Sequence, residues 1–378
     1  MEVKVSTLQI TNGRVIDIKT GNITKKTLYI KDGKFAQGKV GPADETLDVA
    51  DAFLAPGFID LHTHVFNHPL FRHGRLAADR IGVRQGVACV VDAGSSGTST
   101  IDAFPQFVHA TQTTKTYAFI NIGSPGLPHI TEGHASRPEF CDLPGVVKAL
   151  DQHDWLVGVK VLASASHTGS FGLEAVKLAR KAAEISGKPL MLHIGNAPPI
   201  VDDVLDLLTT GDIVTHTFHG KVGGILGYRD KIINSFKAAI DRGVIVDIGH
   251  GRSSFSFRVC ETALAQGMPV NTISSDLHRG NVNEYAISLS RTMNKLRALG
   301  MSFIDVIRAV TSNPAKAIQL SEFGCISAGK PAHLTIFKDV NEPIKLVDAE
   351  GETRTAETQI QPIGVLVDGI HHDVSETL

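Results

Sequence analysis

Two histidines separated by one residue end an apolar run, and later apolar runs carry further side chains that bind metals. His62 and His64 close the segment GFIDLHTH at residues 57–64. Because successive side chains of a strand point to opposite faces, this spacing puts both imidazoles on one face. The later runs contribute side chains of the same chemical types: Lys160, His193, His216, His219, His250 and Asp276.

Each of these residues has an ordinary explanation when it is taken alone. A single histidine at a strand end is usually a packed or surface residue, and an aspartate such as Asp276 often caps a helix. A lysine inside an apolar run is costly, because burial disfavours its ammonium form. Lys160, in VGVKVLA, is such a lysine. The whole set at one end of one domain is better explained as a metal centre.

The types of side chain also indicate which metal and how many ions. Neutral imidazoles and carboxylates suit Zn²⁺, although the same ligands also accept other divalent ions. Two ions held close together need an anion to bridge them. A neutral lysine amine can add CO₂ and become a carbamate, which is a bridging carboxylate on a long arm. Lys160 in that form would explain a lysine in an apolar strand.

Eight short apolar runs, rich in β-branched residues, alternate with helix-like segments. Such runs are typical of parallel strands that are buried on both faces, and eight β–α units predict an α/β protein with a (β/α)8 TIM barrel, in which the catalytic residues lie at the carboxyl ends of the strands. A helix is expected over residues 174–188, with Gly187 as its stop signal. The runs are 57–64, 87–94, 117–123, 156–164, 188–195, 211–218, 243–251 and 269–278.

The two ends of the chain have a different pattern, with short alternating strands. Asn12-Gly13 and Asp32-Gly33 near the start, and Asp368-Gly369 near the end, are hairpin signals. We therefore expect residues 1–54 and 319–378 to form the two parts of one flanking β-sandwich. Residues 55–318 would then form the barrel.

Composition limits the classes of partner. The chain has 378 residues and a net charge of −2, whereas binding to nucleic acid or to a membrane surface favours a basic stripe. No apolar run is long enough to span a bilayer, and the first residues do not resemble a signal peptide. The four cysteines form no CxxC pair. We expect a cytoplasmic protein with a small-molecule substrate, which could form a homo-oligomer.

The chain resembles the amidohydrolase superfamily, in its binuclear subtype with a carboxylated lysine. PGFIDLHTH, the lysine of the fourth run, two later single histidines and the aspartate of the eighth run carry the resemblance, together with NGRVID and NPAKAIQLSEFGCISAGKPAHLTIF. It implies two divalent metal ions, with Zn²⁺ favoured. The implied ligands are His62, His64, Lys160 (N6-carboxylated and bridging), His193, His216 and Asp276.

The resemblance also implies the roles of these residues. His62, His64 and Asp276 would bind one ion, His193 and His216 the other, and a hydroxide between the ions would be the nucleophile. Asp276 would take the proton of that hydroxide and pass it to the leaving group.

Particular segments indicate the branch of the superfamily. VVDAGSSG, INIGSPGL, THTFHG and VDIGHGRSSFSF are similar to a dihydroorotase-like deacetylase branch, whose members are often labelled dihydroorotase or adenine deaminase. This branch implies removal of an acetyl group from a small N-acyl amino acid or from an acyl ester of a hydroxy acid. Cyclic amide hydrolysis of the dihydroorotase or hydantoinase type, deamination of adenine or a related heterocycle, and a metal-free structural role stay open as alternatives.

An acidic substrate would need a guanidinium or imidazole group for its carboxylate. Polar residues at the expected end of the barrel are candidates, although each could equally be a solvated loop residue. These candidates are Ser95, Asn121, His219, His250, Arg252, His278 and Arg279.

Overall fold

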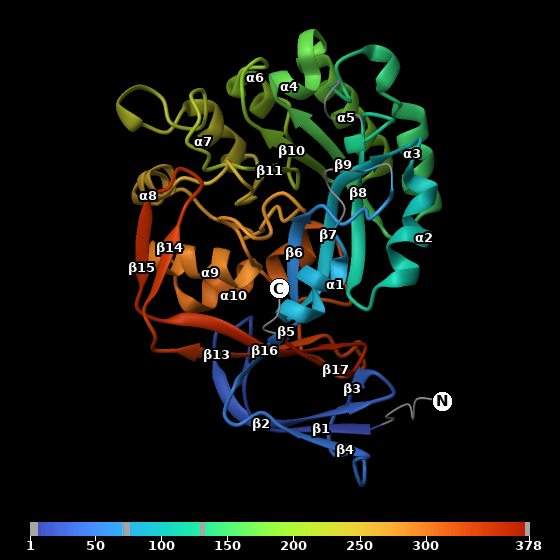
Figure 1. Ribbon diagram of the computed structural model, residues 1–378, viewed down its shortest axis with the longest axis vertical. Helices are drawn as coiled ribbons and strands as arrows, with labels where there is room; N and C mark the ends of the chain where they lie inside the picture. The colour runs from blue at the N-terminus through green and yellow to red at the C-terminus, as the bar shows by residue number, and fades with distance from the viewer. Residues whose placement is uncertain (1–6, 70, 72–75, 129–132, 375–378) are drawn as a thin grey trace.

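The computed structural model describes residues 7–69, 71, 76–128 and 133–374. The described chain forms a seven-stranded parallel sheet, an eight-stranded sheet and a two-stranded hairpin (Figure 1). Among the described residues, no helix is long and apolar enough to cross a membrane.

The parallel sheet has the strand order β12-β11-β10-β9-β8-β7-β6, which is the reverse of chain order. Seven of the eight predicted runs are therefore confirmed as parallel strands, although the last two strands are short. The strand β9 is buried at every position, as its continuous apolar sequence predicts. The strands are β6 (Phe58–Thr63), β7 (Val87–Gly97), β8 (Lys115–Asn121), β9 (Leu156–Ala163), β10 (Leu190–Ile194), β11 (Ile213–Thr215) and β12 (Ile245–Val246).

The eighth predicted run, residues 269–278, does not form a regular strand. It makes two isolated parallel bridges, from Thr272 to Asp247 after β12 and from Leu277 to Thr63 on β6. The segment thus lies between the two edges of the parallel sheet. A regular ladder is interrupted because Asp276 has a positive φ of 51°.

Helices cover the outside of the parallel strands (Figure 1). The predicted helix at 174–188 is confirmed as α5, whose alanine-rich face is buried and which ends at the left-handed Gly187. Helices α3 and α5 pack against each other and against β9. The helices are α1 (Ala78–Ile81), α2 (Phe104–Phe107), α3 (Leu143–Gln152), α4 (Ala165–Thr168), α5 (Leu173–Ser186), α6 (Val201–Asp206), α7 (Asn234–Asp241), α8 (Phe257–Ala265), α9 (Leu289–Ala298), α10 (Phe303–Ala309) and α11 (Ser312–Ala317).

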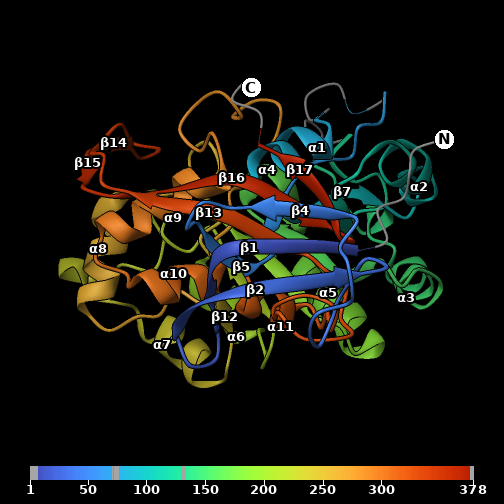
Figure 2. The ribbon, with the colours of Figure 1, turned by 90° about the horizontal axis from the view of Figure 1, so that it is seen from below.

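Both ends of the chain contribute strands to one eight-stranded sheet. Its order is β17-β16-β13-β5-β1-β2-β3, with β4 paired to β1, and β5 runs antiparallel to β13 with Leu54 opposite Ile336. Seen from below, β1 and β2 lie across β13 and β16 (Figure 2), and apolar side chains from both groups of strands form a common core. The strands are β1 (Thr7–Ile16), β2 (Ile23–Lys31), β3 (Lys34–Phe35), β4 (Glu45–Asp48), β5 (Phe53–Pro56), β13 (Leu334–Val340), β16 (Gln359–Val367) and β17 (Ile370–Asp373).

Two of the three predicted hairpin turns are confirmed. Asp32-Gly33 joins β2 to β3 and Asp368-Gly369 joins β16 to β17, with positive φ at all four residues. The turn predicted at Asn12-Gly13 is wrong: the pair lies inside β1, at a register shift that marks a β-bulge. A separate hairpin of β14 (Ile344–Val347) and β15 (Thr353–Ala356) packs against α9.

Candidate metal centre

One carboxylate faces three imidazoles at the carboxyl ends of the parallel strands. Asp276 Oδ1 lies 3.1 Å from His64 Nε2 and 3.5 Å from His62 Nε2, and Asp276 Oδ2 lies 4.0 Å from His216 Nε2. His62, His216 and Asp276 each offer one ligand atom, and these atoms lie within 4.8 Å of one another. This is a donor set that could hold a divalent metal ion.

Lys160 reaches the same place from β9. Its side chain is 1% exposed, and its Nζ lies 3.3 Å from His62 Nε2. Burial lowers the pKa of Lys160 to about 7, although nearby carboxylates, Asp276 first among them, act to raise it. The amine is therefore available in its neutral form near pH 7. Gly94 makes room for this side chain, because a Cβ at that position would lie 2.6 Å from Lys160 Cβ.

His193 approaches the centre from the end of β10. Its ring centroid lies 4.4 Å from that of His216, and its Nε2 is hydrogen bonded to Ser164 Oγ at 3.1 Å. That bond leaves Nδ1 as the ring nitrogen of His193 that is available to a metal ion.

Hydrogen bonds behind the centre set the tautomers of two imidazoles. Thr215 Oγ donates to Asp247 Oδ2 at 2.7 Å, so it accepts a hydrogen bond from His62 Nδ1 at 2.9 Å. His216 Nδ1 donates to the carbonyl oxygen of Gly249 at 2.6 Å. In both rings the unprotonated Nε2 is left to face Asp276, which is how outer hydrogen bonds prepare histidines as metal ligands.

Burial keeps the imidazoles of His62 and His216 neutral, whereas the carboxylate of Asp276 is ionised. Burial lowers the pKa of His62 well below its usual range and that of His216 to about 3. For Asp276, burial alone would raise the pKa, but the hydrogen bond from His64 and the neighbouring His216 lower it to about 2. Neutral nitrogen donors around an ionised carboxylate are what a divalent cation requires.

The backbone is left-handed at two of the candidate ligands. His216 has a φ of 62° and Asp276 a φ of 51°. Residues with side chains adopt this region rarely, and such residues cluster at functional sites. Gly251 packs close to Asp276, since a Cβ there would lie 2.5 Å from Asp276 Oδ2.

Three of the predicted substrate residues are buried and bonded within the protein. Ser95 Oγ is 2.8 Å from His64 Nδ1. Asn121 donates to the carbonyl oxygen of Gly94 and accepts from the N–H of Gly123. His250 Nδ1 is bonded to the Gly251 carbonyl oxygen, and its Nε2 lies 2.6 Å from Lys295 Nζ. The structure thus gives each of them a partner that is not a substrate.

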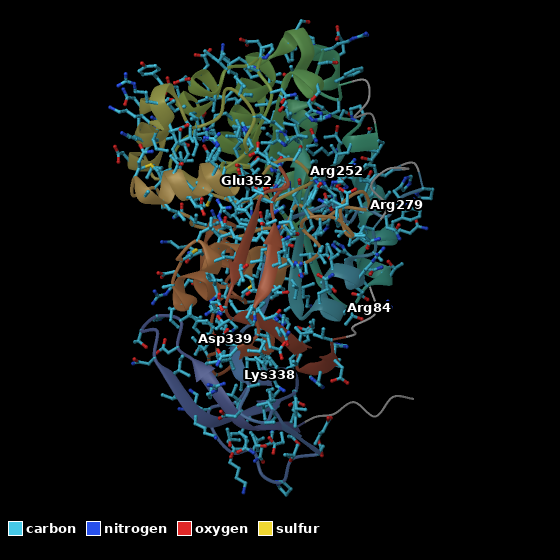
Figure 3. All side chains as sticks on the ribbon, turned by 60° about the vertical axis from the view of Figure 1, so that its left-hand side comes forward. Arg84, Arg252, Arg279, Lys338, Asp339 and Glu352 are labelled. Carbon is cyan, nitrogen blue, oxygen red and sulfur yellow. The ribbon has the colours of Figure 1, made fainter. Side chains whose placement is uncertain are left out.

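The other predicted substrate residues lie nearer the surface or beside the centre. The exposed Arg252 pairs with Glu284 at 3.0 Å, and Arg252 and Arg279 both lie in the part of the molecule around the parallel sheet in Figure 3, away from Lys338 at the eight-stranded sheet. The ring centroid of His278 is 6.3 Å from that of His64. His219 is buried, and its Nε2 has no hydrogen-bond partner among the described residues.

Sequence reasoning missed several polar residues around the centre. Thr215 and Asp247 carry no signal beyond their place in apolar runs, and His134, in a loop, and His167, in the short helix α4, lie outside those runs. Lys221 lies in the glycine-containing segment HGKVGGILG, which follows the run at 211–218. Its position two residues after His219 was an available signal.

Comparisons with known proteins agree over nearly the whole chain. The sequence model of the Amidohydrolase family matches residues 53–370. A protein named deacetylase from Enterococcus faecalis is 36% identical, over 97% of this chain and 99% of its own length. Another deacetylase, from Brucella anthropi, is 35% identical, over 94% of this chain and 90% of its own.

Two solved structures are similar to the same extent but carry other names. One described as an adenine deaminase superimposes with a TM-score of 0.90 at 34% identity, covering 97% of this chain and 99% of that one. One described as a dihydroorotase has a TM-score of 0.91 at 32% identity and covers 98% of both chains.

Proposed function

The chain belongs to the amidohydrolase family and is a hydrolase, and we propose that it is a binuclear metal-dependent deacetylase. Its substrate would be a small N-acyl amino acid or an acyl ester of a hydroxy acid. The observation that carries the binuclear centre is the fully buried Lys160, whose Nζ lies 3.3 Å from His62 Nε2. The similarity to deacetylases along almost the entire chain supports the reaction.

Two metal ions fit the residues that are present. His62, His64 and Asp276 would hold one ion, and His193 and His216 would hold the other, with Zn²⁺ the favoured metal. Lys160, as the carbamate, would bridge them. When bound, such a pair supplies a nucleophile at neutral pH and polarises the acyl carbonyl.

The residues of the chain do the proton chemistry. Asp276 is ionised, so it accepts a proton from the attacking water and passes it to the oxygen or nitrogen of the leaving group. Thr215, His62 and Asp247 form a buried hydrogen-bonded row that prevents the His62 ring from turning.

Two other reactions remain as alternatives. Hydrolysis of a cyclic amide, of the dihydroorotase or hydantoinase type, uses the same attack on a carbonyl carbon and the same ligands. Deamination of adenine would release ammonia instead of a carboxylic acid. Both reactions are included in the test because this chain is similar to structures described as a dihydroorotase and an adenine deaminase.

For the fold as a whole, we propose a (β/α)8 barrel over residues 55–318 and a flanking β-sandwich of residues 1–54 and 319–378. The bridges from Thr272 and Leu277 to the two edges of the parallel sheet support closure by the eighth segment. The pairing of β5 with β13 and the shared apolar core support the sandwich. The four free cysteines support a cytoplasmic location.

The test is a hydrolysis screen of the zinc-loaded protein. The panel holds N-acetyl amino acids and O-acetyl hydroxy acids of both hands, dihydroorotate, a hydantoin and adenine, with acetate, ammonia and ring opening measured for each. Release of acetate from one enantiomeric series is the expected result. Ammonia from adenine, or ring opening without any acetate, would replace the deacetylase proposal with the corresponding alternative.

A further inference from the structure

Lys221 places a positive charge beside the metal centre without a bonded partner. It follows β11 in the loop that begins at His219, and its side chain is about half-buried. Burial lowers the pKa of Lys221, whereas the charge of Asp276 acts to raise it. Among the described residues, no hydrogen bond or ion pair holds its Nζ. Because burial of an unpaired charge is costly, a partly desolvated ammonium of this kind is stabilised by a bound anion.

His219 adds a hydrogen-bond donor of known orientation at the same loop. The backbone N–H of Lys221 donates to His219 Nδ1 at 3.2 Å, so the ring proton of the neutral imidazole is on Nε2. His219 Nε2 is buried and has no acceptor in the part of the chain that the structure describes. Gly224 holds the ring from the other side, because a Cβ there would lie 2.9 Å from His219 Cε1. The loop therefore fixes an unused N–H.

Two more imidazoles without complete hydrogen bonding continue from His193. The ring centroid of His167 lies 5.6 Å from that of His193, and the ring centroid of His134 lies 5.3 Å from that of His167. His167 Nδ1 and both ring nitrogens of the fully buried His134 lack partners among the described residues. Buried polar groups are nearly always hydrogen bonded in native proteins, so this row points to a ligand or ordered water that completes it.

These imidazoles are neutral donors and not cations. Burial, with a smaller contribution from the charge of Lys221, lowers the pKa of His219 and of His167 to about 4. Each ring therefore offers one N–H at neutral pH. The positive charge of the group comes from Lys221 alone.

We propose that Lys221, His219 and His167 bind the carboxylate of the substrate beside the metal centre. The inference rests on the proposed deacetylase function and specifies how its acidic substrates are bound: the ammonium and the imidazole N–H groups hold the free carboxylate. An ammonium with neutral N–H donors satisfies both the charge and the lone pairs of a carboxylate.

The residues first predicted for this task are less suited to it. Arg252 is exposed and already paired with Glu284. Both ring nitrogens of His250 are bonded within the protein. Lys221 has no ion pair or side-chain hydrogen bond among the described residues, and the charge of Asp276 acts on its pKa.

The experiment compares charged and neutral forms of one substrate. The probes are O-acetyl-lactate and N-acetylalanine, each with its carboxamide, which keeps the shape and removes the charge. The variants are Lys221→Met, Lys221→Arg and, as a matched control, Lys231→Met, which removes an exposed lysine from the same loop. Acetate release gives kcat and KM for the zinc-loaded proteins, and thermal denaturation confirms that each is folded.

We expect Lys221→Met to reduce kcat/KM for the charged probes roughly 10- to 100-fold, mainly through KM, because a charge-assisted hydrogen bond is lost. The carboxamides should change less than about threefold. Lys221→Arg should recover part of the loss, and Lys231→Met should behave as the unsubstituted protein. His219→Phe should show the same selective loss of kcat/KM for the charged probes, to a smaller extent.

An equal loss for charged and neutral probes, or no loss at all, would overturn carboxylate binding by Lys221 while leaving the deacetylase function intact. Absence of acetate from every probe and from the whole screening panel would instead overturn the proposed function, and this inference with it.

Discussion

His62 Nδ1 lies 2.9 Å from Thr215 Oγ, and this single contact determines which nitrogen of His62 is free to bind a metal. The hydroxyl group of Thr215 donates its proton to Asp247. Its oxygen can therefore only accept a hydrogen bond from His62. The two residues are 153 positions apart in the chain and meet because β6 and β11 converge at the centre.

Replacing Thr215 by valine should therefore weaken metal binding. Valine keeps the volume but removes the acceptor, so the His62 ring is free to turn or to change tautomer. We expect metal affinity to fall roughly 10- to 100-fold, measured by competition with a chelator. Thr217→Val is the matched control, because Thr217 is equally buried but bonds only to the carbonyl oxygen of Val214. Equal affinities for the two variants would contradict the role of Thr215.

Lys160→Ala should remove the bridge between the proposed metal ions. We expect the bound metal to fall from two ions to one or fewer per chain by elemental analysis, with kcat/KM lower by at least ~100-fold. Added short carboxylic acids should restore part of the activity, since a carboxylate can occupy the place of the carbamate. Lys295→Met is the control, because Lys295 is the other fully buried lysine of the described chain and bonds to His250 and Tyr285 instead. Two ions retained by Lys160→Ala would show that Lys160 does not bridge.

Much of the fold could be predicted because a strand that is buried on both faces has a continuous apolar sequence. The continuous apolar runs identified the parallel strands, and Gly187 identified the end of α5. The failures have local causes. Asn12-Gly13 has the sequence of a hairpin turn but forms a bulge, because β1 continues along β2 on both sides of it. The run at 269–278 is apolar enough for a strand, yet Asp276 adopts a left-handed conformation that a regular strand does not contain.

The part of the candidate site that could be predicted consists of residues able to bind a metal that stand in or at the ends of strands recognisable from the sequence. His62, His64, His216, Asp276 and Lys160 lie together as the register implied. Which residues lie behind the ligands was not predictable, because Thr215 and Asp247 look like any polar residue in an apolar run. The position of the Lys221 loop could not be predicted either. The position of a long glycine-containing loop depends on tertiary contacts, which the periodicity of the sequence does not reveal.

Gly94→Ala should disturb the centre through Lys160. A Cβ at Gly94 would lie 2.6 Å from Lys160 Cβ, and its φ of 79° is unfavourable for alanine. Gly211→Ala is the matched control, with a φ of 86° but nothing within 4 Å of the added Cβ. Both variants should lose about 1 kcal/mol of stability from backbone strain, and Gly94→Ala should lose about 1–3 kcal/mol more from overpacking together with part of its metal. Chemical denaturation and elemental analysis measure the two effects, and identical results for the pair would show that Lys160 has room to move.

Lys295 should make the stability of the protein depend on pH in the alkaline range. Its ammonium position is fully buried and bonds to His250 Nε2 and to the carbonyl oxygen of Tyr285, at 2.6 and 2.7 Å. Burial, assisted by Arg291, lowers its pKa from 10.5 to about 7. Between these two values the folded protein holds Lys295 neutral whereas the unfolded chain binds a proton there. The unfolded state therefore binds more protons, and the free energy of unfolding rises with pH through this window and stops changing below about pH 7.

The contribution of one such group is at most about 1.4 kcal/mol per pH unit. We expect Lys295→Met to lose this slope, so that the difference in urea midpoint between it and the unsubstituted protein changes steadily from pH 7 to pH 9. At pH 7 and below, Lys295 lowers the free energy of unfolding of the unsubstituted protein most. The stability of Lys295→Met relative to that protein should therefore be highest there. Because both proteins keep the metal ligands, the pH dependence of metal binding cancels in the comparison. Lys231→Met, which removes an exposed lysine, should retain the original slope. If Lys295→Met retained it as well, Lys295 would be protonated in the folded state, and the hydrogen bond to His250 would join an ammonium to a neutral imidazole.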